Sequence, residues 1–266
     1  MRPAKRLDAP NLMRQAKSVK ISFRKIKLLK KRVVASLSGR RNVHFLHVRK
    51  AGGTALKHVL GPHQVTPTCM LYLHQHRISL KHVPRGHQVM FVTRDPVARY
   101  VSGFDSRLRQ GAPSRHAPWR GDEEWAFSQF PDPNSLALAL DPAHPAHQNA
   151  LRAMHGITHI RYGYWDWFGD EAALEARRED ILFIGRLETF NADFEELKKP
   201  LGLPENLTLP SDPKRANRNQ SSDTPALEPE AVKWIRHWYR RDYDFLDFCA
   251  QWRDEQQGPV AKSALG

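Results

Sequence analysis

Three short apolar segments, each followed by a stretch with helical spacing, organise the middle of the chain. The segments are rich in β-branched and aromatic residues and are predicted to be strands: Val43–Val48, Val89–Thr93 and Ile181–Ile184. The spacing of apolar residues after them predicts three helices: Thr54–Leu60, Val97–Arg109 and Glu188–Lys199. Strands that alternate with helices predict an α/β fold of three layers, in which helices flank a central, mainly parallel sheet.

The remaining segments are less regular. Residues 111–148 are rich in proline and predict no clear element, and residues 200–226 are predicted to form a loop. Apolar and aromatic positions over Glu228–Trp252 predict a terminal helix, with a break near Tyr243.

The charge of the chain is concentrated at one end. The net charge is +14, and residues 1–42 hold 14 Lys and Arg residues against one acid, Asp8. The rest of the chain is therefore almost neutral. This division predicts a basic arm over residues 1–42, a folded domain over residues 43–252 and a tail over residues 253–266.

The arm has the pattern of a basic amphipathic helix over residues 11–37. Its apolar runs are too short for a signal peptide or a transmembrane span. Such a helix can bind an anionic membrane surface, and the alternative is a solvated helix. A nucleic-acid partner is not expected, because no binding motif accompanies the charge. With only two cysteines there is no disulfide framework, so a cytoplasmic location is expected, with peripheral attachment to the inner face of the membrane as an addition.

The first chemical motif is HFLHVRKAGGTALKHVL, residues 44–60. A predicted strand, a turn with Gly52 and Gly53 and a helix N-terminus together suit a phosphate, because the first amides of a helix have no internal partner. Lys50 adds a positive charge and Thr54 a hydroxyl. An ordinary strand-to-helix turn is the alternative. A Walker A loop is excluded, because the lysine of that pattern follows the last glycine, whereas Lys50 precedes both glycines.

The second motif is VTRDPVARYVSGF, residues 92–104. Arg94 closes a predicted strand, and Ser102 lies two turns into the next helix, so a guanidinium and a hydroxyl could bind a second phosphate. Asp95 could belong to a magnesium-binding Walker B strand. The proline that follows it favours a helix N-cap instead.

A pair of histidines lies between these motifs, in LYLHQHRISL, residues 71–80. On a strand, His74 and His76 would face the same side. Either could act as a general base near neutral pH. A metal pair is the second interpretation, although no third ligand lies at a diagnostic spacing. Surface histidines are the third.

Taken together, HVRKAGGTAL, LHQH and VTRDPVARYVSGF resemble the sulfotransferases that use 3′-phosphoadenosine 5′-phosphosulfate (PAPS). The match is closer to the carbohydrate branch, which includes heparan sulfate and chondroitin 2-O-sulfotransferases. ILFIGRLETFNADFEEL, with Glu188, and the final RRDYDFLDFC also resemble that family. The resemblance implies a P-loop-NTPase-like fold over the predicted domain.

The resemblance also implies roles for individual residues. Arg94 and Ser102 would bind the 3′-phosphate, and His76 would be the base, with His74 assisting or exchanging roles. Lys50 would also stabilise the leaving phosphate. The 5′-phosphosulfate would be held by a loop of seven residues: Arg49, Lys50, Ala51, Gly52, Gly53, Thr54 and Ala55. Arg49 stands where the family usually has proline. No metal is implied.

The resemblance implies in-line transfer of a sulfuryl group from PAPS to a hydroxyl of a carbohydrate or glycolipid. The animal enzymes have a transmembrane anchor that is not evident here, so a bacterial enzyme is expected. Two alternatives remain: a P-loop-type phosphotransferase, and a non-enzymatic module that binds membranes or nucleic acid through the arm.

Three segments are candidates for contact with the acceptor. RYGYWDWFGD, residues 161–170, could stack on sugar rings, but an aromatic cluster more often belongs to the core. A basic loop at Lys214–Asn219 could close on the 3′-phosphate or bind an anionic glycan, and the alternative is a solvated loop. His147, Gln148 and Asn149 could line the acceptor cleft.

Overall fold

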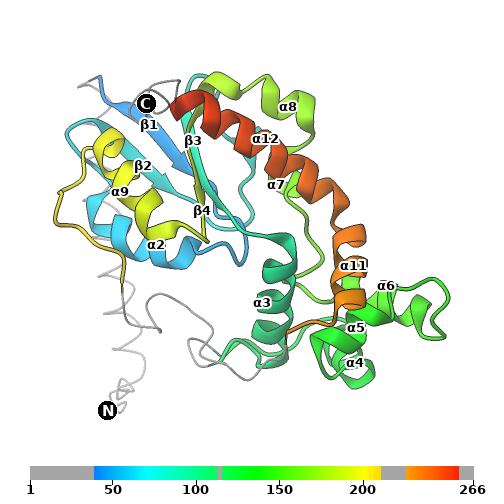
Figure 1. Ribbon diagram of the computed structural model, residues 1–266. Coiled ribbons are helices and arrows are strands. Elements are labelled where there is room, and N and C mark those ends of the chain that lie inside the picture. The colour runs from blue at the N-terminus through cyan, green and yellow to red at the C-terminus, as the bar shows by residue number, and fades with distance from the viewer. Residues whose placement is uncertain (1–38, 113–115, 211–225, 258–266) are drawn as a thin grey trace, which may run out of the picture.

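The computed structural model describes residues 39–112, 116–210 and 226–257, and its centre is a four-stranded sheet (Figure 1). All pairings are parallel, and the spatial order is β2-β1-β3-β4. The strands are β1 (Arg41–Phe45), β2 (Cys69–Leu73), β3 (Gln88–Thr93) and β4 (Ile181–Arg186). The predicted α/β fold with a central parallel sheet flanked by helices is confirmed.

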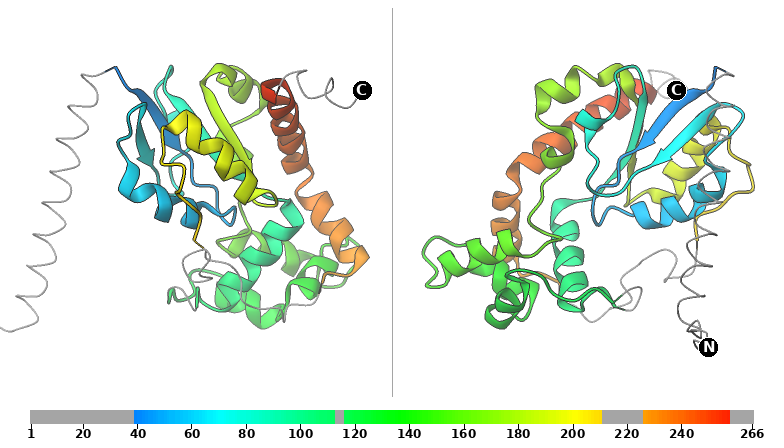
Figure 2. Two further views of the ribbon diagram at one scale, coloured as in Figure 1. Left: turned by 60° about the vertical axis from the view of Figure 1, so that its left-hand side comes forward. Right: turned by 180° about the vertical axis from the view of Figure 1, so that it is seen from behind.

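Two helices cover one face of the sheet, α2 (Gly53–Leu60) and α9 (Phe190–Leu201) (Figure 2). Met90 and Val92 of β3 contribute to a buried cluster there together with Leu56 of α2 and Phe194 of α9. Alternate residues of a strand point to opposite faces. The other residues of β3 are therefore available for a second core.

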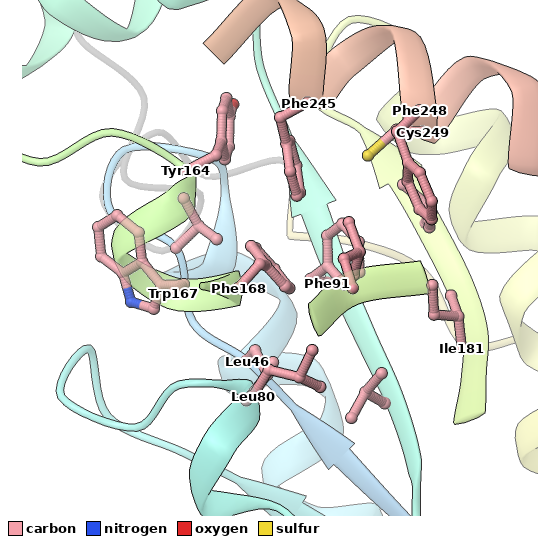
Figure 3. Close-up of a cluster of buried hydrophobic side chains, with 14 of the residues drawn as sticks. Leu46, Leu80, Phe91, Tyr164, Trp167, Phe168, Ile181, Phe245, Phe248 and Cys249 are labelled. Atoms are coloured by element: carbon pink, nitrogen blue, oxygen red, sulfur yellow. The ribbon is translucent and has the colours of Figure 1, made fainter. Parts of the chain in front are cut away.

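The second core covers the opposite face of the sheet (Figure 3). Phe91 of β3 packs against Phe168 and Phe245, with ring centroids 4.4 and 5.9 Å apart. The helices of this layer are α7 (Trp165–Phe168), α8 (Glu171–Glu175) and α12 (Arg240–Gln257). Tyr164 and Trp167 are buried in the same cluster. The core interpretation of the aromatic segment at residues 161–170 is thus confirmed.

A third cluster is made of helices beside the sheet. The helices are α3 (Pro96–Leu108), α4 (Glu123–Gln129), α5 (Pro133–Leu138), α6 (His147–Gly156) and α11 (Pro229–Trp238). Most of the proline-rich segment that predicted no clear element lies here. One of its prolines starts a helix rather than interrupting it: Pro133 is the first residue of α5, and Asp132 caps that helix by accepting from the amide of Ser135.

Short connections complete the fold. They include three 3₁₀ helices, η1 (Gly61–His63), η2 (Leu80–His82) and η3 (Arg178–Asp180). Within the described ranges, no helix combines the length and apolar character that crossing a membrane requires. Residues 1–38 and 211–225 lie outside those ranges, so the membrane prediction for residues 11–37 and the predicted loop at Lys214–Asn219 stay predictions.

Two sequence-based details differ from the structure. The terminal helix breaks at Tyr239 rather than near Tyr243, because the backbone of Tyr239 leaves the helical conformation, with φ −96° and ψ 23°. The buried hydroxyl of Tyr239 donates to the carbonyl of Ile160 at the same point. Strand β2 ends at Leu73, so His74 and His76 follow the strand rather than alternate along it. The last bond to β1 runs from the amide of His74 to the carbonyl of Phe45, where β1 itself ends.

Candidate active site

The glycine turn between β1 and α2 forms the floor of the site. Lys50 and Gly52 both have positive φ, 61° and 75°. A side chain at Gly52 would also place Cβ 2.7 Å from Leu187 Cδ1, and one at Gly53 would place it 2.2 Å from the ring of His47. Both positions therefore require glycine, one for its backbone angle and both for space.

Helix α2 begins at this turn, and its first residues, Gly53 to Ala55, belong to the lining of the site. No side chain caps it, and the amides of its first two residues, Gly53 and Thr54, precede the first bond within the helix, which the amide of Ala55 donates to the carbonyl of Gly52 at 3.1 Å. The partial positive charge of a helix N-terminus adds to this arrangement, which is that of an anion site. Lys57 lies one turn along α2, and its ammonium donates to the carbonyl of His74 at 2.9 Å.

The second motif meets the first at the carboxyl ends of β1 and β3. The guanidinium of Arg94 donates to the carbonyl of Lys50 at 3.2 Å. The hydroxyl of Tyr164 accepts from the amide of Arg94 at 2.8 Å and donates to its carbonyl at 2.6 Å. Ser102 is buried on α3. Asp95 caps α3 by accepting from the amide of Ala98 at 2.9 Å, so the capping prediction is confirmed.

His76 is held by two backbone contacts in the loop after β2. Its Nδ1 lies 2.8 Å from the carbonyl oxygen of His47, and Trp167 Nε1 donates to the carbonyl of His76 at 2.9 Å. A carbonyl only accepts, so Nδ1 carries the proton and Nε2 keeps its lone pair. Burial, followed by the charges of Arg49, Lys57 and Lys50, lowers the pKa of His76 despite the bond to His47. The ring is therefore neutral at pH 7.

The glycine turn, the second motif and His76 all line one cavity of about 1040 Å³. It is lined by His76, Ser102 and the loop from Arg49 to Ala55 except Ala51, which is buried in the hydrophobic core. It has a strongly cationic lining of six Lys and Arg residues: Arg49, Lys50, Lys57, Arg94, Arg107 and Arg120. One of them, Arg107, is paired with the buried Glu123 at 2.5 Å. No described lining residue is acidic, so the cavity is suited to a multiply charged anion.

Three residues of the lining also carry buried nitrogen atoms that lack a partner among the described residues: His47 Nδ1, Arg49 Nε and His159 Nδ1. Burial and nearby cations lower the pKa of His47 to about 2 and that of His159 to about 3. Burial, then the charges of Arg94 and Arg109, lower the pKa of Lys50 to about 8. At neutral pH the positive charge of the cavity thus comes from Lys and Arg.

His74 is placed apart from the cavity lining. Its Nε2 lies 2.8 Å from His44 Nδ1, and His44 Nε2 lies 2.9 Å from His87 Nδ1. The structure therefore brings one of the two predicted base candidates, His76, to the anion site. His147, Gln148 and Asn149 at the start of α6 are likewise absent from its lining.

Several lining residues were missed by sequence reasoning. His47 and Lys57 flank the glycine turn, and the i, i+4 spacing of Gly53 and Lys57 on a helix could have indicated the second of them. Arg120, Thr158 and His159 carry no local signal. The packing of α3, α4 and α6 brings them to the cavity.

Comparison with known proteins agrees with this geometry. The family model described as "Sulfotransferase family" matches residues 35–249, which is most of the chain and includes every described lining residue of the cavity. Searches of curated proteins and of solved structures give no match. The chain belongs to the sulfotransferase family, and its activity is the transfer of a sulfuryl group.

Proposed function

We propose that this sulfotransferase uses PAPS as donor and a hydroxyl of a carbohydrate or glycolipid as acceptor. The supporting observation is that one cationic cavity contains the glycine turn, Arg94 with Ser102, and a neutral histidine. The donor carries three phosphate and sulfate groups, which matches a lining of Lys and Arg without acids. The acceptor class rests on the resemblance to the carbohydrate branch.

The loop and helix α2 would hold the 5′-phosphosulfate. The amides of Gly53 and Thr54, the Thr54 hydroxyl and Lys50 provide donors at one end of the cavity. Arg94 and Ser102 would hold the 3′-phosphate from β3 and α3. PAPS supplies an activated sulfuryl group, whose bond to the 5′-phosphate breaks as the acceptor oxygen attacks. Lys50 and the amides stabilise negative charge where it builds up on the leaving phosphate.

His76 would remove the proton of the acceptor hydroxyl. Its Nε2 has the lone pair, because Nδ1–H is bonded to the carbonyl of His47. The same bond orients the ring, and the bond from Trp167 Nε1 to the carbonyl of His76 holds the backbone that carries it. Burial, and then the positive charges of the lining, lower the pKa of His76, so the imidazole is available as a base at neutral pH.

Nucleotide binding tests the donor assignment. Adenosine 3′,5′-bisphosphate at about 100 times its Kd should stabilise the protein by about 2.7 kcal/mol, which raises Tm by several degrees. Adenosine 5′-monophosphate, which lacks the 3′-phosphate, should give a smaller shift at the same concentration, and Arg94→Ala should remove that difference. Differential scanning calorimetry measures both. A shift with ATP–magnesium and none with the bisphosphate would favour a phosphotransferase and contradict the proposal.

The low pKa of Lys50 predicts how nucleotide affinity depends on pH. Below about pH 8 its ammonium is charged before the nucleotide binds. A bound phosphate raises that pKa, so binding above pH 8 requires uptake of a proton. The Kd for adenosine 3′,5′-bisphosphate, measured by calorimetry from pH 7 to pH 9.5, should be constant at first. It should then rise, approaching about tenfold per pH unit.

Lys50→Gln is the control for this pH dependence. The variant should bind the nucleotide more weakly at pH 7 and show no rise in Kd between pH 8 and pH 9.5. A wild-type Kd that stays constant to pH 9.5 would contradict a contact between Lys50 and the nucleotide.

A further inference from the structure

A second cavity, of about 380 Å³, lies beside α11 and the start of α6. It shares no lining residue with the catalytic cavity. Its walls include two indoles, two imidazoles, one guanidinium and an aliphatic residue: Trp234, Trp238, His147, His237, Arg240 and Leu151. A cavity of this size and mixed chemistry falls at the small end of ligand sites.

Two buried nitrogen atoms of this lining lack a partner among the described residues, Trp234 Nε1 and His147 Nδ1. An indole N–H can only donate, and leaving a buried donor unpaired is unfavourable. A ligand oxygen would satisfy Trp234, and a hydroxyl, which both donates and accepts, would satisfy His147 in either tautomer. The unpaired atoms therefore point to an oxygen-rich ligand.

The aromatic rings are held in place by their neighbours. Trp234 and Trp238 are four residues apart on α11 and so share a face. His237 packs edge-on against Trp234 and His155 against Trp238, with ring centroids 6.1 and 5.3 Å apart. Indoles that are partly buried and fixed in this way offer flat apolar surfaces next to polar donors, and the apolar face of a sugar ring can stack on such a surface.

The charge of the lining selects among sugars. Arg240 and the two histidines are the ionisable residues of the lining, and no described member is acidic. A carboxylate or sulfate on the sugar would complement Arg240. Arg240 is exposed and solvated, so an acidic sugar would gain a charge-assisted contact that a neutral sugar cannot make.

Helix α6 links the two cavities. His147 is its first residue and lines the second cavity, while Thr158 and His159, just beyond its last residue, line the catalytic cavity. Ten helical residues span about 15 Å. A ligand that reaches both places has to be a chain of several sugar units.

We propose that the second cavity binds an acidic sugar residue of the acceptor chain, one helix length, about 15 Å, from the wall of the catalytic cavity at Thr158 and His159. The proposal rests on the proposed function and adds a length requirement to it. A short acceptor that ends before this cavity would lose the contact with Trp234 and Arg240. A longer acceptor would gain this contact, and the binding of the donor would not change.

Nuclear magnetic resonance of the indole N–H groups tests the site directly in the full-length chain. The probes are a hyaluronan hexasaccharide, which carries carboxylates, and chitohexaose, which is neutral. The hexasaccharide should shift the Trp234 signal, and chitohexaose should do so only at a concentration at least tenfold higher. An unchanged Trp234 signal with both probes would overturn the proposal. Equal shifts with both would overturn its acidic specificity.

Variants separate this site from the donor site. Trp234→Phe, which keeps a ring and removes the N–H, and Arg240→Gln should each raise the Kd for the hyaluronan hexasaccharide at least fivefold. Trp125→Phe, a tryptophan of α4 outside both linings, should leave it unchanged. All three should bind adenosine 3′,5′-bisphosphate like the wild type. Unchanged hexasaccharide affinity in both site variants would overturn the sugar site, whereas loss of nucleotide binding by the wild type would instead contradict the proposed function.

Discussion

His76→Ala is expected to lower kcat by about 10²–10⁴-fold, the usual contribution of a general base. The neutral Nε2 of His76 is the base candidate within the cationic cavity, and alanine removes it without touching the glycine turn or Arg94. The affinity for adenosine 3′,5′-bisphosphate should stay within about twofold of the wild-type value, because a base contributes to transfer rather than to donor binding. Transfer from radiolabelled PAPS, with an acceptor found on a carbohydrate panel, gives kcat, and calorimetry gives the affinity.

His74→Ala is the matched comparison, because this histidine lies two residues away but outside the cavity lining. We expect it to keep most of the wild-type kcat. If His74→Ala loses turnover and His76→Ala keeps it, the base is His74. If His76→Ala loses nucleotide binding as well, its role is in the donor site rather than in proton transfer.

Asp242→Asn is expected to lower the free energy of unfolding by about 3–5 kcal/mol, the usual cost of breaking a buried ion pair by removing one partner. The carboxylate of Asp242 accepts from the guanidinium of Arg99 at 2.5 Å, and both side chains are almost fully buried. Burial opposes the charge of Arg99, and Asp242 more than offsets this, so the pKa of Arg99 is raised. Asparagine would leave a buried guanidinium without its counterion. Urea unfolding measures the change.

An exposed ion pair provides the control for this prediction. Asp122 and Arg152 lie 3.0 Å apart with about half of each side chain exposed. Solvent screens such a pair, so Asp122→Asn should leave the urea midpoint unchanged. Replacing both buried partners, as Arg99→Met with Asp242→Leu, should recover part of the loss. Equal effects of the two single asparagine variants would contradict the assigned role of burial.

The Arg99–Asp242 pair also joins two blocks that are far apart in the sequence. Arg99 belongs to VTRDPVARYVSGF and Asp242 to RRDYDFLDFC, and the pair joins α3 to α12. Asp242 also accepts from the amide of Tyr164, whose hydroxyl holds the backbone of Arg94. The terminal helix thus supports the proposed 3′-phosphate contact through two buried residues. Neither block by itself indicates this link.

Local signals predicted the parts of the site that are continuous in the chain. The apolar run before Thr93 predicted β3, and Asp95 with Pro96 predicted the start of α3, because cap and proline act on the adjacent backbone. The same holds for the glycine turn, where strand, turn and helix N-terminus follow one another. Its two glycines are explained by contacts with His47 and Leu187, of which the second is distant in sequence.

Other features depended on partners far along the chain. The two-residue spacing of His74 and His76 predicted a shared strand face, yet β2 ends at Leu73 where its neighbour β1 ends. The histidines then diverge, His76 to the cavity and His74 to His44. A strand's length depends on the strand beside it, and spacing along one segment contains no information about that neighbour.

The sequence by itself determined the α/β fold, the anion-binding turn and the resemblance to sulfotransferases, because these depend on periodicity and on residues that are adjacent in the chain. The tertiary structure alone decided that His76 rather than His74 lines the cavity, that Thr158 and His159 join it, and that Trp234 and His147 share a second cavity. The physical reason is that cavities form where helices pack, and packing brings together side chains whose separation in sequence gives no local signal.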